Sequence, residues 1–70
     1  MSEIQILDIF SKNLTEMMNE DNISQDDLAK EVGVSQPTIS KYINGQCMPS
    51  IFTLIKLSEV FFCSLDDFFK

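Results

Sequence analysis

The sequence predicts an all-α fold of five helices built around a helix-turn-helix, at about residues 4–19, 25–32, 36–44, 51–62 and 65–69. Apolar residues recur at intervals of three and four, which is the spacing of amphipathic helices. No segment alternates apolar and polar residues in the way of a strand. A chain of 70 residues has the size of one domain, so we assign residues 1–70 to a single folded unit.

The first two helices follow from apolar stripes and from capping residues. The stripe of the first helix is formed by Ile4, Leu7, Phe10, Leu14 and Met17. Asn22 follows it, and asparagine tolerates the left-handed conformation that often ends a helix. Ser24 can cap the second helix, with Asp27 near the positive end of its dipole. Gly33 stops this helix, because glycine adopts positive φ at little cost.

The third helix begins almost directly after the second, and this defines the turn of the motif. Only Val34 separates Gly33 from Ser35, which is the cap of the third helix. Pro37 lies in the first helical turn, where a missing amide proton costs nothing, and Gly45 ends the helix. Two short helices joined by so tight a turn are typical of a helix-turn-helix.

Capping residues and apolar spacing also predict the last two helices. Pro49 and Ser50 open the fourth, whose apolar residues are Ile51, Leu54, Ile55, Leu57, Val60 and Phe61. Ser64 caps a short final helix, with Asp67 three residues on.

Composition excludes several classes of function. The chain has no histidine, and Cys47 and Cys63 have no metal-ligand spacing, so we expect no metal, no cofactor and no catalytic site. The paired acids Asp26–Asp27 and Asp66–Asp67 are explained as helix-start charges. No apolar run approaches the roughly 20 residues of a membrane span, and no signal peptide is visible. We therefore expect a cytoplasmic protein without a membrane partner.

Charge is distributed unevenly along the chain. The net charge is −6, although nucleic-acid-binding proteins usually carry a basic surface. Between Val34 and Ser58, however, there is no aspartate or glutamate, and the charged residues are Lys41 and Lys56. Chance clustering is the simple alternative to a segment kept free of carboxylates for function.

The outer face of the third helix is the candidate reading surface. At 100° per residue this face is formed by Gln36, Pro37, Ser40, Lys41 and Asn44. A major groove of about 12 Å width admits a helix, where glutamine can bond to adenine, lysine can donate to guanine and proline can contact a thymine methyl group. A merely solvated polar face is the alternative on these residues alone.

The pattern of the whole chain resembles the lambda-repressor/Cro-type helix-turn-helix family. The match runs from about Phe10 to Phe69 and includes Gly33, Asn44-Gly45 and Pro49-Ser50 at the family spacing. The resemblance implies a transcriptional regulator that binds double-stranded DNA, in a bacterial or phage-type host. Because the sequence has no second domain, we expect no small-molecule ligand. The resemblance implies base contacts by Gln36, Pro37, Ser40 and Lys41. It also implies phosphate contacts by Gln25 and Asn44, with Thr38, Tyr42 and Gln46 as further candidates.

Three departures from the family pattern are informative. Met18 and Ile43 stand where the family often has an arginine and a glutamate, and we expect these two apolar residues to pack together. Phe62 replaces a usual glycine, so we expect the fourth helix to end differently, because a bulky residue with positive φ is an outlier. Phe52 replaces a usual polar residue.

Apolar residues near the C-terminus are the candidates for a dimer interface. The family implies a Cro-like repressor that occupies its operator as a homodimer, on half-sites about one helical turn apart. We name Phe52, Phe62 and Phe69 as interface candidates. A protein-interaction module that has lost DNA reading is the second hypothesis, since the net charge is −6 and the chain has no arginine. An enzyme is the third and has no site to support it.

Overall fold

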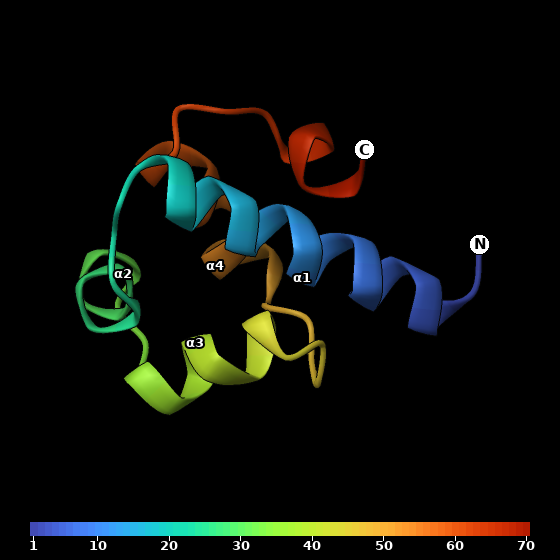
Figure 1. The fold of residues 1–70 in the computed structure, drawn as a ribbon, viewed down its shortest axis with the longest axis horizontal. Helices are drawn as coiled ribbons and strands as arrows, with labels where there is room; N and C mark the ends of the chain where they lie inside the picture. The colour runs from blue at the N-terminus through green and yellow to red at the C-terminus, as the bar shows by residue number, and fades with distance from the viewer.

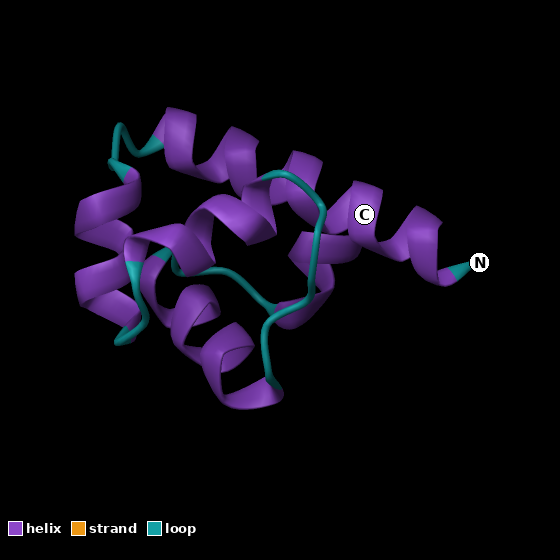
Figure 2. Cartoon of the chain, turned by 90° about the horizontal axis from the view of Figure 1, so that it is seen from below, coloured by secondary structure: helices purple, strands orange, loops and turns teal.

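The computed structural model describes residues 1–70, as four α-helices followed by one 3-10 helix. The elements are α1 (Glu3–Glu20), α2 (Gln25–Val32), α3 (Gln36–Ile43), α4 (Ile51–Val60) and the 3-10 helix η1 (Leu65–Phe69). Figure 2 shows helices joined by loops, without a strand. The all-helical prediction is confirmed, but the count of five α-helices is wrong. The last segment has five residues, too few for a stable α-helical nucleus, and takes the tighter 3-10 form.

The helix α1 lies across the other elements and extends beyond them at its N-terminal end (Figure 1). A capping box fixes this end, since the Ser2 hydroxyl accepts from the Gln5 N–H at 3.2 Å and Gln5 Oε1 accepts from the Ser2 N–H at 2.8 Å. Phe10, Leu14 and Met18 are buried, four residues apart. Ile4, which we predicted in the same stripe, is 71% exposed, because α1 begins outside the core.

Phe10 lies at the centre of an aromatic cluster. Its ring is 6.3 Å from that of Tyr42 in α3 in an edge-to-face arrangement, and 5.7 Å from that of Phe68 in η1. Phe69 stacks on the other side at 6.1 Å. Such pairs contribute about 0.5–1.5 kcal/mol beyond their burial. The cluster therefore joins the first, third and last elements, and no polar side chain is buried in the core.

Each α-helix is followed by a residue with positive φ, which reverses the chain. These residues are Asn22 (53°), Gly33 (75°), Gly45 (70°) and Phe62 (52°). Three of the four are residue types that accept this conformation readily, as predicted. At Phe62 the expectation of a different helix end was wrong. Two backbone bonds, from the Phe62 N–H to Glu59 O at 3.4 Å and from the Cys63 N–H to Ser58 O at 3.0 Å, form the usual left-handed cap and end α4 at Val60, not at residue 62.

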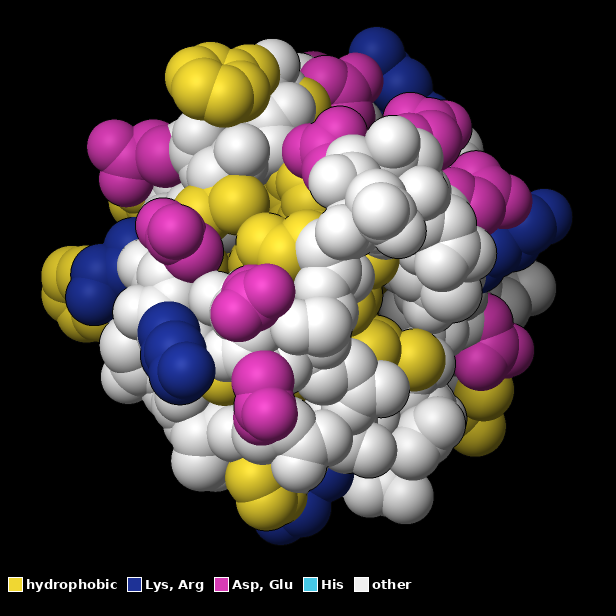
Figure 3. All heavy atoms as spheres, turned by 60° about the vertical axis from the view of Figure 1, so that its left-hand side comes forward, with side chains coloured by type: hydrophobic (Ala, Val, Ile, Leu, Met, Phe, Trp, Pro, Cys, Tyr) yellow, Lys and Arg dark blue, Asp and Glu magenta, His cyan; other side chains and the backbone are white.

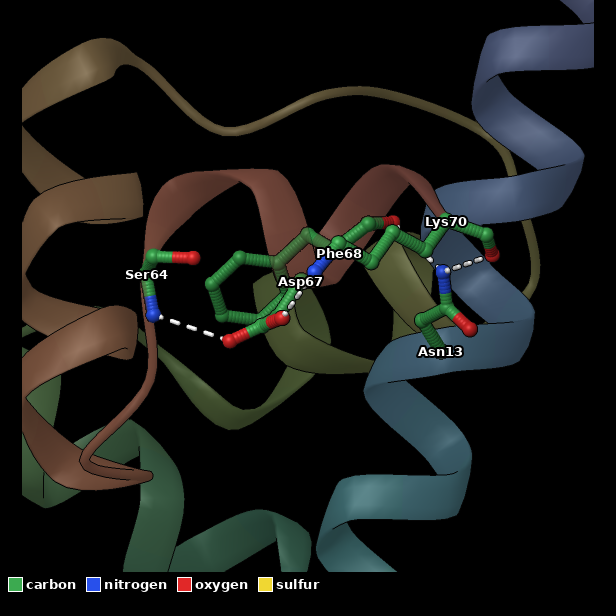
Figure 4. Close-up of polar contacts among 5 residues, drawn as sticks. All are labelled: Asn13, Ser64, Asp67, Phe68 and Lys70. Carbon is green, nitrogen blue, oxygen red and sulfur yellow. Dashed lines mark hydrogen bonds and ion pairs between the residues drawn. The ribbon is translucent and has the colours of Figure 1, made fainter.

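Besides the ring contacts with Phe10, hydrogen bonds from one side chain of α1 hold the 3-10 helix η1 in place (Figure 4). Asn13 donates from Nδ2 to Phe68 O at 2.8 Å and to Lys70 O at 3.1 Å. At the start of η1 the Ser64 N–H donates to Asp67 Oδ2 at 3.0 Å, and Lys70 Nζ lies 3.1 Å from Asp67 Oδ1. The Ser64 backbone bond, helped by Lys70, lowers the pKa of the Asp67 carboxyl below its ordinary value.

The two thiols and the apolar character of the helices complete the description of the fold. Both cysteines are free and half-buried. Cys47 packs against the core. Burial, with a smaller contribution from the neighbouring Cys47, raises the pKa of Tyr42. None of the helices combines the length and the apolar character needed to cross a bilayer.

Candidate nucleic-acid interface

A fixed turn sets α3 at a defined angle to α2. The Gly33 and Val34 N–H groups both donate to Ala29 O, at 2.9 and 3.0 Å, and Val34 packs against the core. Ser35 then caps α3, where its hydroxyl accepts from the Thr38 N–H at 3.3 Å. Because both helix ends are satisfied by local bonds, the two helices hold a rigid relative orientation.

One side of α3 is buried and the opposite side is open. Ile39 is fully buried and Tyr42 is 5% exposed, whereas α3 as a whole lies along an outer edge of the molecule (Figure 1). The exposed outer residues are Gln36, Pro37, Lys41 and Asn44, with Ser40 half-buried among them. The structure therefore brings together on one face the residues expected to contact bases, and α3 contains no carboxylate.

The two glutamines of the site are joined across the motif. Gln36 Nε2 donates to Gln25 Oε1 at 2.6 Å, from the start of α3 to the start of α2. One amide hydrogen of Gln36 and its Oε1 remain free, and this is the donor and acceptor pair that adenine requires. Gln25 keeps both of its own amide hydrogens free. The bond thus holds the Gln36 amide in place before any ligand binds.

The candidate phosphate contacts fall into two groups. Gln25 begins α2, where unpaired amides and the helix dipole favour an anion. Asn44 and Gln46 are exposed at the other end of α3, and Asn44 Nδ2 lies 3.5 Å from Ser40 Oγ. These groups lie at the two ends of the row that is expected to contact bases.

Thr38 and Tyr42 are less available than the other candidates. Thr38 is half-buried as a residue, and its hydroxyl is engaged in a hydrogen bond with the Ser35 hydroxyl at 2.8 Å. Tyr42 packs against Phe10 in the core, and burial raises its pKa. Its phenol is therefore neutral at physiological pH, and a phosphate contact through it stays a prediction.

The structure adds one residue that sequence reasoning missed. Asp8 in α1 approaches the end of α3, since a Cβ at Gly45 would lie 3.8 Å from Asp8 Oδ1. This places a carboxylate beside Asn44 and Gln46. No local pattern could reveal it, because the contact spans 37 positions of the chain.

The three candidates for a dimer interface do not share one surface. Phe52 is 75% exposed at the start of α4, beside Ile51 at 55% and Ile55 at 44%. Phe62 follows the other end of α4, about 15 Å along the helix axis. Phe69 is half-buried and stacks on Phe10, so it belongs to the core of its own chain.

Met18 and Ile43 both contribute to the hydrophobic core. Met18 is buried, and Ile43 is half-buried and packs against the same cluster. Their direct contact stays a prediction.

Comparison with known proteins identifies the family. Residues 14–68 match the HTH_3 family, described as helix-turn-helix. The chain belongs to this family. The HTH_3 domain is 31% identical over 62 residues to the uncharacterized HTH-type transcriptional regulator YqaE of Bacillus subtilis, and this match covers 89% of the chain but 53% of the relative. It is 38% identical over 48 residues to the uncharacterized HTH-type transcriptional regulator MJ0272 of Methanocaldococcus jannaschii, covering 69% of the chain and 73% of the relative.

Solved structures agree with this assignment. The solution structure of the SOS-response transcriptional repressor LexA from Eubacterium rectale is similar with a TM-score of 0.87 at 26% identity, over 91% of this chain and 68% of that one. An HTH_3 family transcriptional regulator from Vibrio cholerae shares the fold, with a TM-score of 0.86 at 24% identity, over 97% of this chain and 38% of that one. The HTH_3 domain thus spans about half the length of the Bacillus relative, and the relatives that it matches are named as HTH-type transcriptional regulators.

Proposed function

We propose that this HTH_3 domain, over residues 1–70, binds a specific sequence of double-stranded DNA through α3 and regulates transcription there. The observation that carries the proposal is the Gln25–Gln36 hydrogen bond on an exposed helix face without carboxylates. A polar face that is merely solvated needs no amide fixed in place by a second helix.

The proposal assigns a base contact to the outward-facing side chains of α3. Gln36 bonds an adenine edge, Lys41 donates to a guanine, and Pro37 with Ser40 contacts a thymine methyl group or a neighbouring base. Gln25 and Asn44, aided by Gln46, bond the phosphates on either side of the groove. Phosphate contacts fix the register of the protein, and base contacts select the sequence.

The exposed end of α4 supports a homodimer on the DNA. Ile51, Phe52 and Ile55 lie within one arc of the helix and form an apolar patch. Helix-turn-helix dimers bind half-sites about 34–36 Å apart, a spacing similar to the longest dimension of one copy, which measures 31 × 23 × 22 Å. A dimer that covers an operator acts as a Cro-like repressor, and one structural neighbour is itself named a transcriptional repressor.

The net charge of −6 favours the second hypothesis, a domain that binds protein in place of DNA. Selection of bound sequences from a random duplex library at low salt separates the two. We expect wild type to enrich a palindromic site.

Variants of matched charge sharpen the selection. Lys41→Ala and Lys30→Ala remove the same charge, but Lys30 belongs to α2 and not to the exposed face of α3. We expect Lys41→Ala to change the preferred bases of the half-site and Lys30→Ala to leave them unchanged. Absence of enrichment by the folded wild type would refute DNA reading, whereas enrichment of a single half-site would refute the dimer alone.

A further inference from the structure

A hollow opens on the side of the molecule away from α3. It lies between the turn after α1, the outer side of α2 and the end of α4, and we call it the Phe62 hollow. Ile23 and Val60 form its apolar floor, and Phe62 stands at its edge. Figure 3 shows hydrophobic side chains at the bottom of this depression, with acidic side chains around them.

The Phe62 side chain packs against almost nothing in its own chain. Its side chain is 96% exposed, so its ring has almost no intramolecular contact. Its φ of 52° is unfavourable for a bulky residue such as phenylalanine. A large apolar group in a costly conformation, beside an apolar floor, is a surface suited to a partner.

The rim of the hollow determines the chemistry of that partner. Asp21, Asp27, Glu31 and Glu59 surround the floor, and none of their carboxylates takes part in an ion pair or accepts a side-chain hydrogen bond. Lys30 and Lys56 also reach the rim, but the acids outnumber them by two to one. A cationic ligand therefore complements the hollow, and a nucleic acid does not.

A second copy of this chain does not meet this requirement. It carries five lysines against eleven acids, and no two of its lysines are adjacent in the sequence. Two acidic copies would place like charges against the rim. This separates the Phe62 hollow from the apolar patch at the start of α4, where a second copy is proposed to bind.

We propose that the Phe62 hollow binds a basic segment of another protein. One apolar side chain of that segment packs on Ile23, Val60 and Phe62, and lysine or arginine residues beside it pair with the rim carboxylates. The hollow leaves α3 free, so the HTH_3 domain can hold this partner and a DNA site together.

Selection from a displayed library of random peptides of about twelve residues tests the proposal on the full chain. Wild type is the target, and Phe62→Gly is used for counter-selection. The glycine variant keeps its fold, because it relieves the positive φ. We expect the enriched peptides to share an aromatic or aliphatic residue flanked by lysine or arginine.

Affinities of one synthesised peptide then locate the site. We expect Phe62→Gly to weaken binding about tenfold or more, as loss of an aromatic anchor does. Glu59→Lys should weaken it roughly two- to fivefold, whereas Glu16→Lys, which makes the same charge change on α1 outside the hollow, should not.

Several results would overturn the proposal. They are enriched peptides without positive charge, the absence of any peptide that distinguishes wild type from Phe62→Gly, and equal weakening by Glu59→Lys and Glu16→Lys. A fall in the oligomeric state of Phe62→Gly in sedimentation would also overturn it, because the hollow would then hold a second copy.

Discussion

Replacing Phe62 by glycine should stabilise the HTH_3 domain, although it removes a large apolar side chain. The residue is at φ 52°, where a side chain costs about 1–2 kcal/mol. Glycine in place of another residue costs about 0.5–1 kcal/mol through the greater freedom of the unfolded chain. The ring is 96% exposed, so its removal sacrifices almost no buried area. At the midpoints of these two ranges, the net gain in the free energy of unfolding is about 0.75 kcal/mol.

Thermal and urea unfolding measure this gain directly. A domain of this size responds to 1 kcal/mol with a change of about 4–8 °C in Tm, so we expect Phe62→Gly to raise Tm by about 2–8 °C. Phe62→Ala is the control, because alanine removes the ring but keeps the unfavourable Cβ. If alanine and glycine raised Tm equally, or if glycine lowered it, the reasoning from backbone conformation would be refuted.

Three further predictions concern charge and the docking of η1. Asp8→Asn should tighten DNA binding about twofold in a titration at low salt, and the gain should shrink as salt is added, since a carboxylate near the phosphate-contacting end of α3 is removed. The pKa of Asp67 is lowered in the native state, so its carboxylate stabilises the fold above the unfolded-chain pKa, and this contribution is lost as the pH falls through the native value. As the pH falls below about 4, the free energy of unfolding measured with urea should therefore decrease less for Asp67→Asn than for wild type. Asn13→Ala should lower the free energy of unfolding by about 1–2 kcal/mol, because two carbonyl groups of the C-terminal segment lose their donor; an unchanged value would show that aromatic packing alone holds η1.

Local chemistry explains why much of the fold was predictable. Helix starts at Ser24, Ser35 and Ser50 follow from side chains that accept a backbone N–H three residues on, and the structure has all three bonds. Stops at Gly33 and Gly45 follow from the same kind of short-range preference. The exposed row of α3 follows from helical periodicity alone.

The remaining features depend on contacts between distant segments. The stacking of Phe69 on Phe10 and the approach of Asp8 to Gly45 arise only when α1 packs on the later elements. The Gln25–Gln36 bond needs the angle set by the turn. Phe62 was mispredicted for a different reason, since the hydrogen bonds of the cap outweighed the intrinsic preference of the residue.

The central claim is that α3 reads bases. Its most direct test is whether a single variant loses the ability to distinguish an A·T pair from a G·C pair. The measurement is the affinity of wild type and Gln36→Ala for the selected duplex and for a duplex in which the contacted A·T pair is replaced by G·C. One bidentate base contact contributes about 1–3 kcal/mol of discrimination, so wild type should prefer the A·T duplex about tenfold or more. Gln36→Ala should bind both duplexes with nearly equal affinity. Discrimination that survives unchanged in Gln36→Ala at every A·T pair of the half-site would contradict the account.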